Sequence, residues 1–285
     1  MGDFAGKTVI VTGGSSGIGL ATAKAFAARG ADVALIARDL TKLTTAKKAV
    51  EAAGVGGQQR VVAISADVAD SKAITKAIND IMGQFGTPDV LVNSAGIFIP
   101  GNFEDMSEEL FRQHMDVDVL GLIAATRAVV PAMRERGSGH IVNVASVAGF
   151  IGVFGYTAYS TAKFAVMGFS EALRAEMKPL GIKVSVVCPP DVDTPGLTNE
   201  KLYRPAECDK VCGNIKAIAP EQVAGDILRA VEKGQYFVVI GGISRLYFRL
   251  KGLLPELFFA ITDGDVASAR KERMAESEPA PESTL

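Results

Sequence analysis

Short β-branched runs alternate with longer amphipathic stretches along most of this chain. The runs are almost continuously hydrophobic, which is typical of parallel strands that helices cover on both faces. They lie at Thr8–Thr12, Asp32–Ile36, Arg60–Ser65, Val90–Asn93, Gly139–Val144 and Lys183–Val187, with a last candidate at Tyr236–Ile240. The main helical stretches between them are Gly19–Ala28, Leu40–Ala53, Ser71–Phe85 and Ser107–Arg136. Repeated βα units predict an α/β fold with one doubly wound parallel sheet of about seven strands and helices on both faces.

The composition favours a globular protein of the cytoplasm. The chain has 285 residues, 48% of them hydrophobic, and a net charge of −2, which gives no electrostatic reason to expect a nucleic-acid partner. An odd number of cysteines argues against a disulfide scaffold, and no signal-like pattern begins the chain. Cys208 and Cys212 are four residues apart, but the only histidines are His114 and His140, so we expect no metal site.

The domain boundary is predicted near residue 262. No linker rich in proline or serine divides the preceding chain, so we expect one domain over residues 1–262, including an apolar lid segment over 197–262. Residues 263–285 are polar, and we expect a short helix near Val266–Ala275 and then a disordered acidic tail.

The segment Ile243–Ile261 (ISRLYFRLKGLLPELFFAI) is rich in Leu and Phe but also carries three cations and a proline. These residues argue against a helix that spans a bilayer. Two interpretations remain open. The segment packs against the core or a partner subunit, or it lies on a membrane surface or over the mouth of an apolar substrate site.

A glycine-rich turn, TGGSSGIG, follows the first predicted strand and opens the first helix. Glycines there permit a tight turn and close approach of the backbone to a pyrophosphate, and the helix N-terminus offers unpaired N–H groups. Serine hydroxyls add further donors. This strand–turn–helix context predicts a Rossmann-type dinucleotide site with contacts from Gly13, Ser15, Ser16, Gly17, Ile18 and Gly19.

The end of the second strand indicates which dinucleotide binds. A site for NAD usually places a carboxylate there, but this strand ends with Ala37 followed by Arg38. Arg38, with Lys42 one turn later, can pair with a 2′-phosphate, which favours NADPH or NADP. Asp39 is the complication, since its carboxylate could instead cap the following helix.

Other cofactor contacts are expected in the loops after later strands, because ligands of open α/β sheets bind at the carboxyl ends of strands. Asp67 would contact the adenine or serve only as a turn residue, and Asn93 would brace the top of the sheet. The remaining predicted contacts are Val68, Ala95, Gly96, Pro189 and Thr194.

Tyr159 and Lys163 lie four residues apart in YSTAK and would share one helix face, while Ser146 ends the fifth strand. A nearby ammonium favours the tyrosinate and lowers a tyrosine pKa, and a serine hydroxyl can hold a carbonyl oxygen. These three residues would supply a proton to a carbonyl oxygen while a nicotinamide supplies hydride to its carbon. Tyr159 and Lys163 would also lie against the cofactor.

These motifs, in this order, resemble the short-chain dehydrogenase/reductase family over roughly Lys7–Pro195. The resemblance implies a Ser–Tyr–Lys catalytic set at Ser146, Tyr159 and Lys163. The family usually has an asparagine where this chain has Asp118 in HMDVDVLG, and that asparagine supports a proton relay. We include Asp118 among the catalytic candidates and expect its charge to offset that of the lysine; the alternative is a solvated helix residue.

The residues expected around the site are apolar, so a hydrophobic ketone is favoured over a sugar or an acid. The stretches GVFGYTAYSTAKFAVMGFSEALRAEMKP and PPDVDTPG are similar to members that use NADPH to reduce the ketone of long-chain sphingoid bases at a membrane. Asp191 and Asp193 would brace this loop or face a substrate amine.

Other apolar ketones, such as steroids or 3-oxoacyl thioesters, and a non-catalytic sensor or scaffold role remain alternatives. The family also implies a homo-oligomer, a dimer or tetramer.

Overall fold

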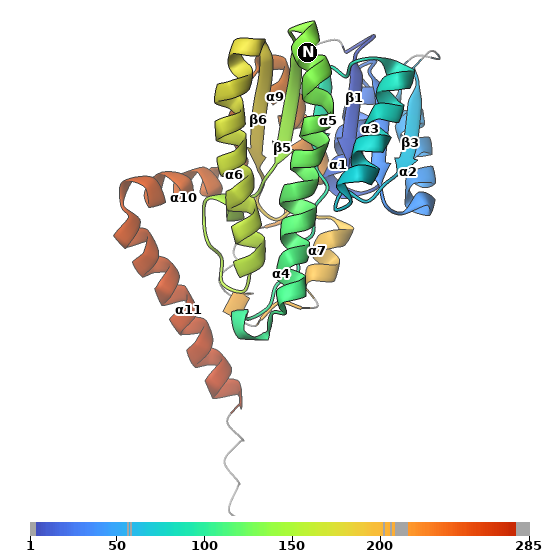
Figure 1. Cartoon of the computed structure of the whole chain (residues 1–285). Helices are drawn as coiled ribbons and strands as arrows, with labels where there is room; N and C mark the ends of the chain where they lie inside the picture. The colour runs from blue at the N-terminus through green and yellow to red at the C-terminus, as the bar shows by residue number, and fades with distance from the viewer. Residues whose placement is uncertain are drawn as a thin grey trace, which may run out of the picture.

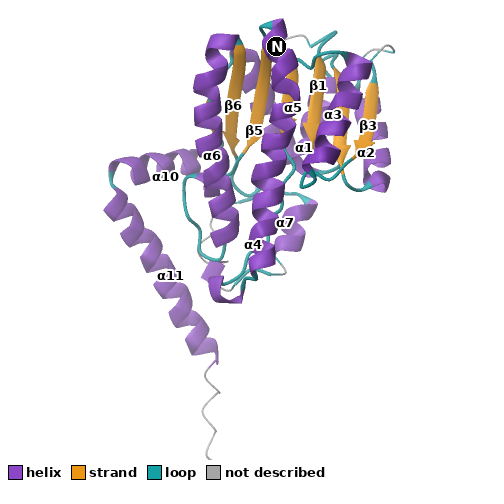
Figure 2. Cartoon of the chain, viewed as in Figure 1, coloured by secondary structure: helices purple, strands orange, loops and turns teal. Residues whose placement is uncertain are grey.

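The computed structural model describes residues 4–55, 57, 59–201, 203–205, 207–208 and 216–277. Its centre is a seven-stranded parallel sheet with the order β3-β2-β1-β4-β5-β6-β7 (Figure 1, Figure 2). The strands are β1 (Thr8–Thr12), β2 (Asp32–Ala37), β3 (Val61–Ser65), β4 (Val90–Asn93), β5 (Gly139–Val144), β6 (Ile182–Cys188) and β7 (Phe237–Val239). Strand order reverses between β1 and β4, which is where open α/β sheets bind ligands. The predicted doubly wound α/β fold is confirmed.

Helices form a layer on each face of the sheet. One layer holds α1 (Gly17–Ala27), α2 (Leu40–Ala53) and α9 (Pro220–Lys233). The other holds α3 (Ser71–Phe85), α4 (Glu108–Met115), α5 (Gly121–Arg136) and α6 (Thr157–Met177), in front of the sheet in Figure 1. The remaining helices are α7 (Pro195–Glu200), α10 (Gly242–Leu253) and α11 (Pro255–Ser277).

The strands bury both faces because their side chains alternate between the two layers. Val9 and Val11 of β1 belong to the cluster that packs with α1, α2 and α9, whereas Ile10 between them belongs to the cluster with α3 and α5. All three are fully buried. Successive side chains of a strand point to opposite faces of the sheet. A strand that is apolar at every position therefore requires a helical layer on each side.

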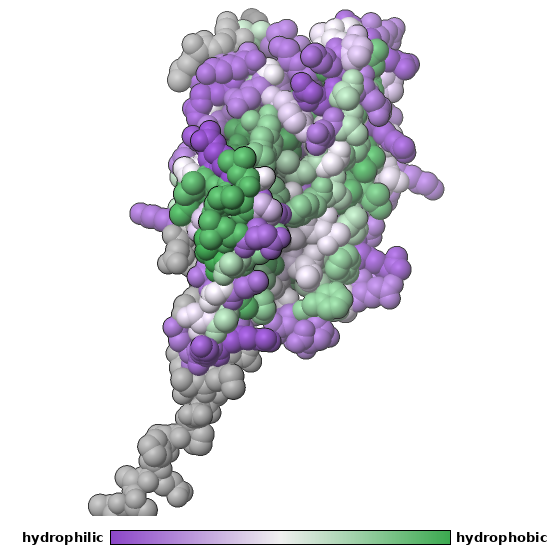
Figure 3. Space-filling model, turned by 90° about the vertical axis from the view of Figure 1, so that its left-hand side faces the viewer, coloured by the Kyte–Doolittle hydropathy of each residue, from purple (hydrophilic) through white to green (hydrophobic). Residues whose placement is uncertain are grey.

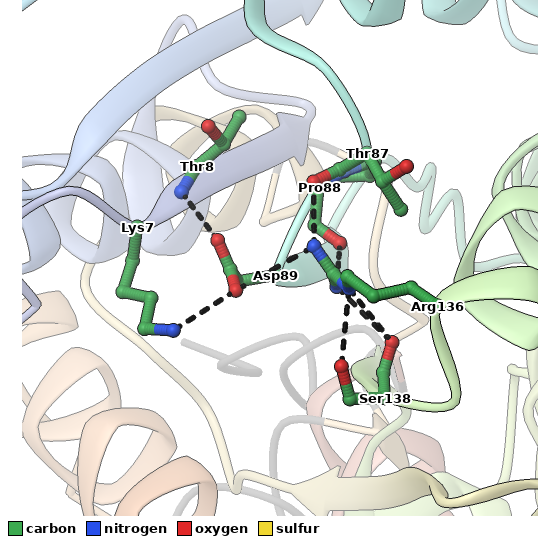
Figure 4. A network of polar contacts seen from close by, with 7 residues as sticks. All are labelled: Lys7, Thr8, Thr87, Pro88, Asp89, Arg136 and Ser138. Atoms are coloured by element: carbon green, nitrogen blue, oxygen red, sulfur yellow. Dashed lines mark hydrogen bonds and ion pairs between the residues drawn. The ribbon is translucent and has the colours of Figure 1, made fainter.

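The amino edge of the sheet is held by polar contacts around Asp89 (Figure 4). Its carboxylate accepts from the backbone N–H of Thr8 at 2.9 Å and pairs with Lys7 Nζ at 3.3 Å and Arg136 Nη1 at 3.6 Å. Arg136 also donates to the backbone oxygen of Pro88 at 2.7 Å. Asp89 thus ties the starts of β1 and β4 to the end of α5, at the edge opposite the carboxyl ends of the strands.

Two segments differ from the sequence prediction. The stretch Ser107–Arg136 is not one helix, because a π-helical turn, Asp116–Leu120, separates α4 from α5. At the other end, α11 runs without interruption from Pro255 through the predicted boundary at residue 262 to Ser277. The expected short helix at Val266–Ala275 is therefore the second half of a longer one. The tail expected after it lies outside the described residues, and the single-domain division stays a prediction.

Large apolar side chains are exposed on α10 and α11. Figure 3 shows an apolar patch on the side of the molecule that carries these helices. The exposed residues there are Ile243, Leu246, Phe248, Leu253, Leu254, Leu257, Phe259 and Ile261. Within the described part of the chain, no helix is both long enough and apolar enough to cross a membrane.

Candidate active site

One large cavity opens at the carboxyl ends of β4, β5 and β6, with a volume of about 1200 Å³. The cavity is lined by residues from distant parts of the chain: the glycine turn, the loops after β4, β5 and β6, the first turns of α6, and the α10–α11 segment. Of the predicted residues, Ile18, Gly96, Ser146, Tyr159, Lys163, Pro189 and Thr194 all line it.

The turn between β1 and α1 packs so closely that two of its glycines have no room for a side chain. Gly13 has a φ of 68°, and a Cβ there would lie 2.7 Å from the backbone nitrogen of Ala95. A Cβ on Gly19 would lie 2.3 Å from the oxygen of Gly13. The Ser16 side chain makes no capping hydrogen bond at the start of α1. The close packing holds the turn tightly bent, and the uncapped start of α1 leaves backbone N–H groups and a positive helix end for a ligand, a cradle that fits a pyrophosphate.

The residues expected to select the cofactor lie together beside this cradle. Arg38 is exposed, and its Nη1 lies 3.8 Å from Asp67 Oδ2. Asp39 Oδ1 accepts from the backbone N–H of Lys42 at 2.9 Å, so Asp39 caps α2, as the alternative interpretation proposed. Asp67 also accepts from the backbone of Ala69 at 3.0 Å, which makes it a turn residue at least. Because Arg38 stays exposed beside Asp67, an anionic ligand can reach its guanidinium from solvent.

Asn93 braces the top of the sheet, as the sequence predicted. Its Nδ2 donates to Asn143 Oδ1 at 2.9 Å and to Thr126 Oγ1 at 3.1 Å, joining β4 to β5 and α5. The Thr12 hydroxyl accepts from the backbone N–H groups of Ser94 and Ala95. Sequence reasoning missed Thr12, which ends β1, and Asn143, which lies one residue before the end of β5. Together these bonds fix the Ala95–Gly96 backbone beside the cradle.

Ser146, Tyr159 and Lys163 converge at one end of the cavity. Lys163 is buried, and its Nζ lies 5.5 Å from the centre of the Tyr159 ring and 3.4 Å from the Val144 carbonyl oxygen. The Ser146 and Tyr159 side chains share a hydrogen bond. The three predicted residues are thus brought together by β5 and by one face of α6.

The pKa of Tyr159 does not follow the simple expectation from the sequence. Burial raises the pKa of Tyr159 above its usual range, and the hydrogen bond from Ser146 opposes that rise. The charges of Asp118, Glu200 and Asp191 raise the pKa further. The pKa of Tyr159 is thus raised, and not lowered as the sequence led us to expect, because burial and the nearby carboxylates prevail.

Asp118 is a buried neighbour of this group. It is 1% exposed, and Oδ1 accepts from the backbone N–H of Ile97 at 2.8 Å. Burial raises the pKa of Asp118, while the nearby charge of Lys163 lowers it. The alternative of a solvated helix residue is wrong, because the π-helical turn directs this side chain inward. Within the described part of the chain, Oδ2 has no hydrogen-bond partner.

His114 is a neighbour that the sequence reasoning did not use. It is fully buried, and its ring centre lies 6.5 Å from that of Tyr159. Its Nε2 accepts from the backbone N–H of Ile99 at 3.2 Å, so Nδ1 carries the proton that it shares with the Leu110 oxygen. A neutral imidazole with both nitrogens occupied supports the Ile97–Ile99 loop.

A second polar cluster, also missed, joins the proline loop to α7. Tyr156 donates to Glu200, and Arg204 pairs with Glu200 at 2.7 Å and with Asp191 at 3.0 Å. Asp191, Glu200 and Tyr156 all line the cavity. Asp191 therefore braces its loop, and one of its interpretations is confirmed. No spacing in the sequence connects Tyr156 to Glu200, which lie 44 positions apart.

The proline loop lies against the glycine turn. The Pro189 oxygen accepts from the backbone of Val147 at 3.0 Å, and Thr194 Oγ1 caps α7 by accepting from Leu197 at 3.3 Å. A Cβ on Gly17 would lie 3.0 Å from Thr194 Cγ2. The loop after β6 and the turn after β1 thus face each other across the switch point of the sheet.

The Ile243–Ile261 segment has two different faces. Tyr247, Leu250 and Phe258 line the cavity, and Phe258 is only 3% exposed. Leu253, Leu254 and Leu257 point to solvent. The segment thus lies over the mouth of the candidate site, as the second interpretation proposed, and it also presents an apolar surface to solvent.

Comparisons with known proteins agree with this geometry. A family model described as "short chain dehydrogenase" matches residues 7–203. A 3-dehydrosphinganine reductase of Danio rerio is 44% identical over 232 residues, which cover 81% of this chain and 70% of that protein. Among solved structures, levodione reductase superposes with a TM-score of 0.79 at 26% identity, covering 85% of this chain and 99% of that one. A variant of actinorhodin polyketide ketoreductase with NADPH gives 0.74 at 28% identity, covering 83% and 96%.

Proposed function

The chain belongs to the short chain dehydrogenase family and is an oxidoreductase, and on that premise we propose that it uses NADPH to reduce 3-ketodihydrosphingosine or a near relative. One observation carries the proposal. A single cavity connects the Ser146–Tyr159–Lys163 group to long apolar walls and, through Ile18, to the glycine cradle. Such a cavity accommodates a cofactor and a long-chain ketone together.

NADPH fits the residues that are present. The cradle formed by Gly13, Gly17 and Gly19 would hold the pyrophosphate, with hydroxyl donors from Ser15 and Ser16. Arg38 and Lys42 would hold the 2′-phosphate. The other predicted contacts, Ile18, Asp67, Val68, Asn93, Ala95, Gly96, Pro189 and Thr194, lie at the carboxyl edge around this path. When bound, NADPH supplies the hydride that reduces the carbonyl carbon.

Tyr159 is the proposed proton donor. Its raised pKa keeps the phenol protonated at neutral pH, as donation to the developing alkoxide requires. Ser146 would hold the same carbonyl oxygen through its hydroxyl. Lys163, buried beside the Tyr159 ring, would stabilise the tyrosinate that is left after proton transfer. Asp118 would fix the Ile97 loop and moderate the charge of Lys163.

An amino ketone suits the charges near Tyr159 better than a steroid or a 3-oxoacyl thioester. Asp191 and Glu200 both reach the cavity wall and share the single guanidinium of Arg204. A substrate ammonium next to the carbonyl would add a second cation there. The name of the Danio rerio relative supports the same substrate class.

We also propose a peripheral contact between the exposed face of residues 243–261 and a membrane surface. Leu253, Leu254 and Leu257 are 78%, 54% and 51% exposed, and Arg245 and Arg249 lie on the preceding helix. Basic residues beside exposed leucines suit an anionic bilayer. Leu254→Glu should reduce co-sedimentation with vesicles of phosphatidylserine and phosphatidylcholine, whereas Val55→Glu, exposed elsewhere, should not. Equal sedimentation of both variants would reject the contact.

A homo-oligomer formed through α4–α5 and α6 is proposed on the family resemblance. Light scattering of the purified chain tests it, since a monomeric mass at micromolar concentration would contradict it. For localisation, we propose that the protein lies in the cytoplasm and attaches to a membrane surface through residues 243–261.

The decisive experiment measures NADPH oxidation with three ketones: 3-ketodihydrosphingosine, a steroid ketone and an acetoacetyl thioester. We expect the first to give the highest kcat/KM, and Tyr159→Phe to lose nearly all turnover while still binding NADPH. Preference for another ketone would favour the runner-up. Tight NADPH binding with no turnover of any ketone would favour a sensor or scaffold. A fully active Tyr159→Phe variant would overturn the mechanism.

A further inference from the structure

The inward face of α11 forms a stripe that follows the cavity. Phe258 and Ala269 are buried, and Thr262 and Val266 between them are partly buried. These residues recur at intervals of four, four and three, which places them on one face of a helix. Residues on the other faces, such as Leu257 and Ala260, are exposed. The helix thus has a defined side toward the body of the protein.

Opposite this stripe lies the apolar wall of the catalytic cavity. Phe258, Thr262, Val266 and Arg270 line the same cavity as Tyr159. From Phe258 to Arg270, α11 extends roughly 18 Å at its usual rise per residue. Ile151, Val153 and Phe164 are among the residues that line the cavity from the body. The cavity therefore continues along α11 as a groove, long enough to follow an extended alkyl chain. Its wall on the body side is apolar, and α11 adds Phe258 and Val266 as well as the polar residues Thr262, Asp263, Asp265 and Arg270.

One lysine fastens the outer wall of this groove. Lys251, near the end of α10, donates to the Phe150 carbonyl oxygen at 2.7 Å, a contact between residues 101 positions apart. Its Nζ also lies 5.1 Å from the centre of the Phe164 ring and 5.9 Å from that of Phe259. The Phe150 and Phe248 rings meet edge to face at 5.1 Å. These contacts connect α10, and through it α11, to the loop that follows Ser146.

We propose that the groove between α11 and the Phe150–Phe164 wall binds the alkyl chain of the substrate, and that Lys251 positions its outer wall. The inference rests on the proposed reductase function. It adds a binding site for a long saturated chain in a segment beyond residues 7–203, which the family model matches. The residues that select the length of the substrate chain would thus be different from the residues that donate the proton.

Blocking the groove far from Tyr159 tests the site. Val266→Trp should lower kcat/KM for the long-chain keto substrate about tenfold or more, as expected when several buried methylenes lose their contacts. A short-chain ketone with the same amino alcohol head should be reduced as before. The matched control is Gly264→Trp, which adds the same ring at an exposed position of the same helix with open space around it and should affect neither substrate. Equal loss with both substrates, or no loss with either, would overturn the groove.

Lys251 is tested as a positioning residue. Lys251→Met should raise KM for the long chain with little change in kcat and none for the short ketone, and Lys251→Arg should restore most of the loss. A fall in kcat for both substrates would show a general structural role instead.

A binding measurement separates this inference from the proposed function. Calorimetry with the long-chain and short-chain amino alcohols reports on the groove even if neither ketone is reduced. We expect the wild type to bind the long chain at least about tenfold more tightly, and Val266→Trp to lose that difference. Equal affinity of the wild type for both alcohols would reject the groove, whereas absent turnover with chain-dependent binding would reject only the reductase assignment.

Discussion

Tyr159 shows how single residues divide the work of the site. Burial and three carboxylates raise the pKa of Tyr159, so the phenol stays protonated until the substrate develops charge. In the proposed mechanism Lys163 would stabilise the tyrosinate left after proton transfer, and the nearby Asp118 carboxylate would offset part of that effect. Burial is the largest cause of the raised pKa of Tyr159, and Asp118 is the first of the three carboxylates that raise it further.

Removing the Asp118 charge should shift the pKa of Tyr159. Because the Asp118 charge raises the pKa of Tyr159, Asp118→Asn should lower it, and ketone reduction should then decline at a lower pH on the alkaline side. Turnover near neutral pH should be retained or increased. The pH dependence of kcat/KM measures this, with Asp116→Asn, exposed on the same turn, as the control. A collapse of activity at every pH would show that the carboxylate has a role of its own.

Arg38 should select the cofactor. Arg38→Ala should raise KM for NADPH at least about tenfold, since a charge-assisted contact to the 2′-phosphate is lost, and should change KM for NADH little. Lys47→Ala provides the control, because Lys47 is a partly exposed cation on α2 that pairs at 3.7 Å with Glu51. Steady-state kinetics with both dinucleotides decide the matter. An equal effect on NADPH and NADH would remove Arg38 from phosphate recognition.

Individual residues were predictable where the chemistry lies in a short motif. The Tyr159–Lys163 spacing and the glycine turn each specify a local geometry, so the sequence was sufficient for them. The Tyr156–Glu200–Arg204 cluster was not predictable, because its members meet only after the proline loop folds back over the cavity. Asp39 is an intermediate case. The sequence allowed its carboxylate either to cap α2 or to contact a ribose, and only the structure shows that it forms the cap.

At the scale of elements, irregular backbone positions the functional groups. The helical stretch after Ser107 was expected to be continuous, but the π-helical turn inserts between α4 and α5 and directs Asp118 inward. Turns of this kind are frequent at functional sites. Hydrophobic periodicity does not predict the turn, because apolar residues recur on the buried face both before and after it.

The turn between β1 and α1 should tolerate no side chain at its first glycine. Gly13→Ala would combine a φ of 68° with a Cβ 2.7 Å from Ala95 N, so the backbone of the cradle must shift. We expect NADPH affinity to fall by about tenfold or more. Gly83→Ala, in α3 with no atom within 4 Å of the added carbon, should leave affinity unchanged. Fluorescence titration with NADPH compares the two, and equal affinities would contradict the cradle.

At the scale of the whole molecule, the sheet keeps the candidate site and a stabilising polar network at opposite edges. The carboxyl edge carries the cavity, and the amino edge is held by Asp89 and Arg136 (Figure 4). The sequence predicted the sheet because each strand is locally apolar. It did not predict contacts such as that of Lys251 with Phe150, which depend on where α10 returns to the body.

The amino edge should contribute to stability without affecting turnover. Asp89→Ala should lower the free energy of unfolding by about 1–3 kcal/mol, because the buried N–H of Thr8 and the two cations lose their acceptor. The value of kcat should remain that of the wild type, since the cavity lies at the opposite edge. Urea denaturation measures the first and NADPH oxidation the second. Asp80→Ala, which removes only an exposed pair with Lys76, is the control and should change stability by less than about 1 kcal/mol.

The start of α1, where the Ser16 side chain makes no capping bond, has a consequence for the supply of folded protein. An anionic ligand bound there favours the folded chain alone, so its free concentration adds to folding stability, by about 2.7 kcal/mol at one hundred times its Kd. The oxidised and reduced dinucleotides carry the same phosphates, so a cell in which the whole pool is depleted would hold less of the folded reductase as well as less of its reductant. Enzyme abundance would then follow the total size of the dinucleotide pool.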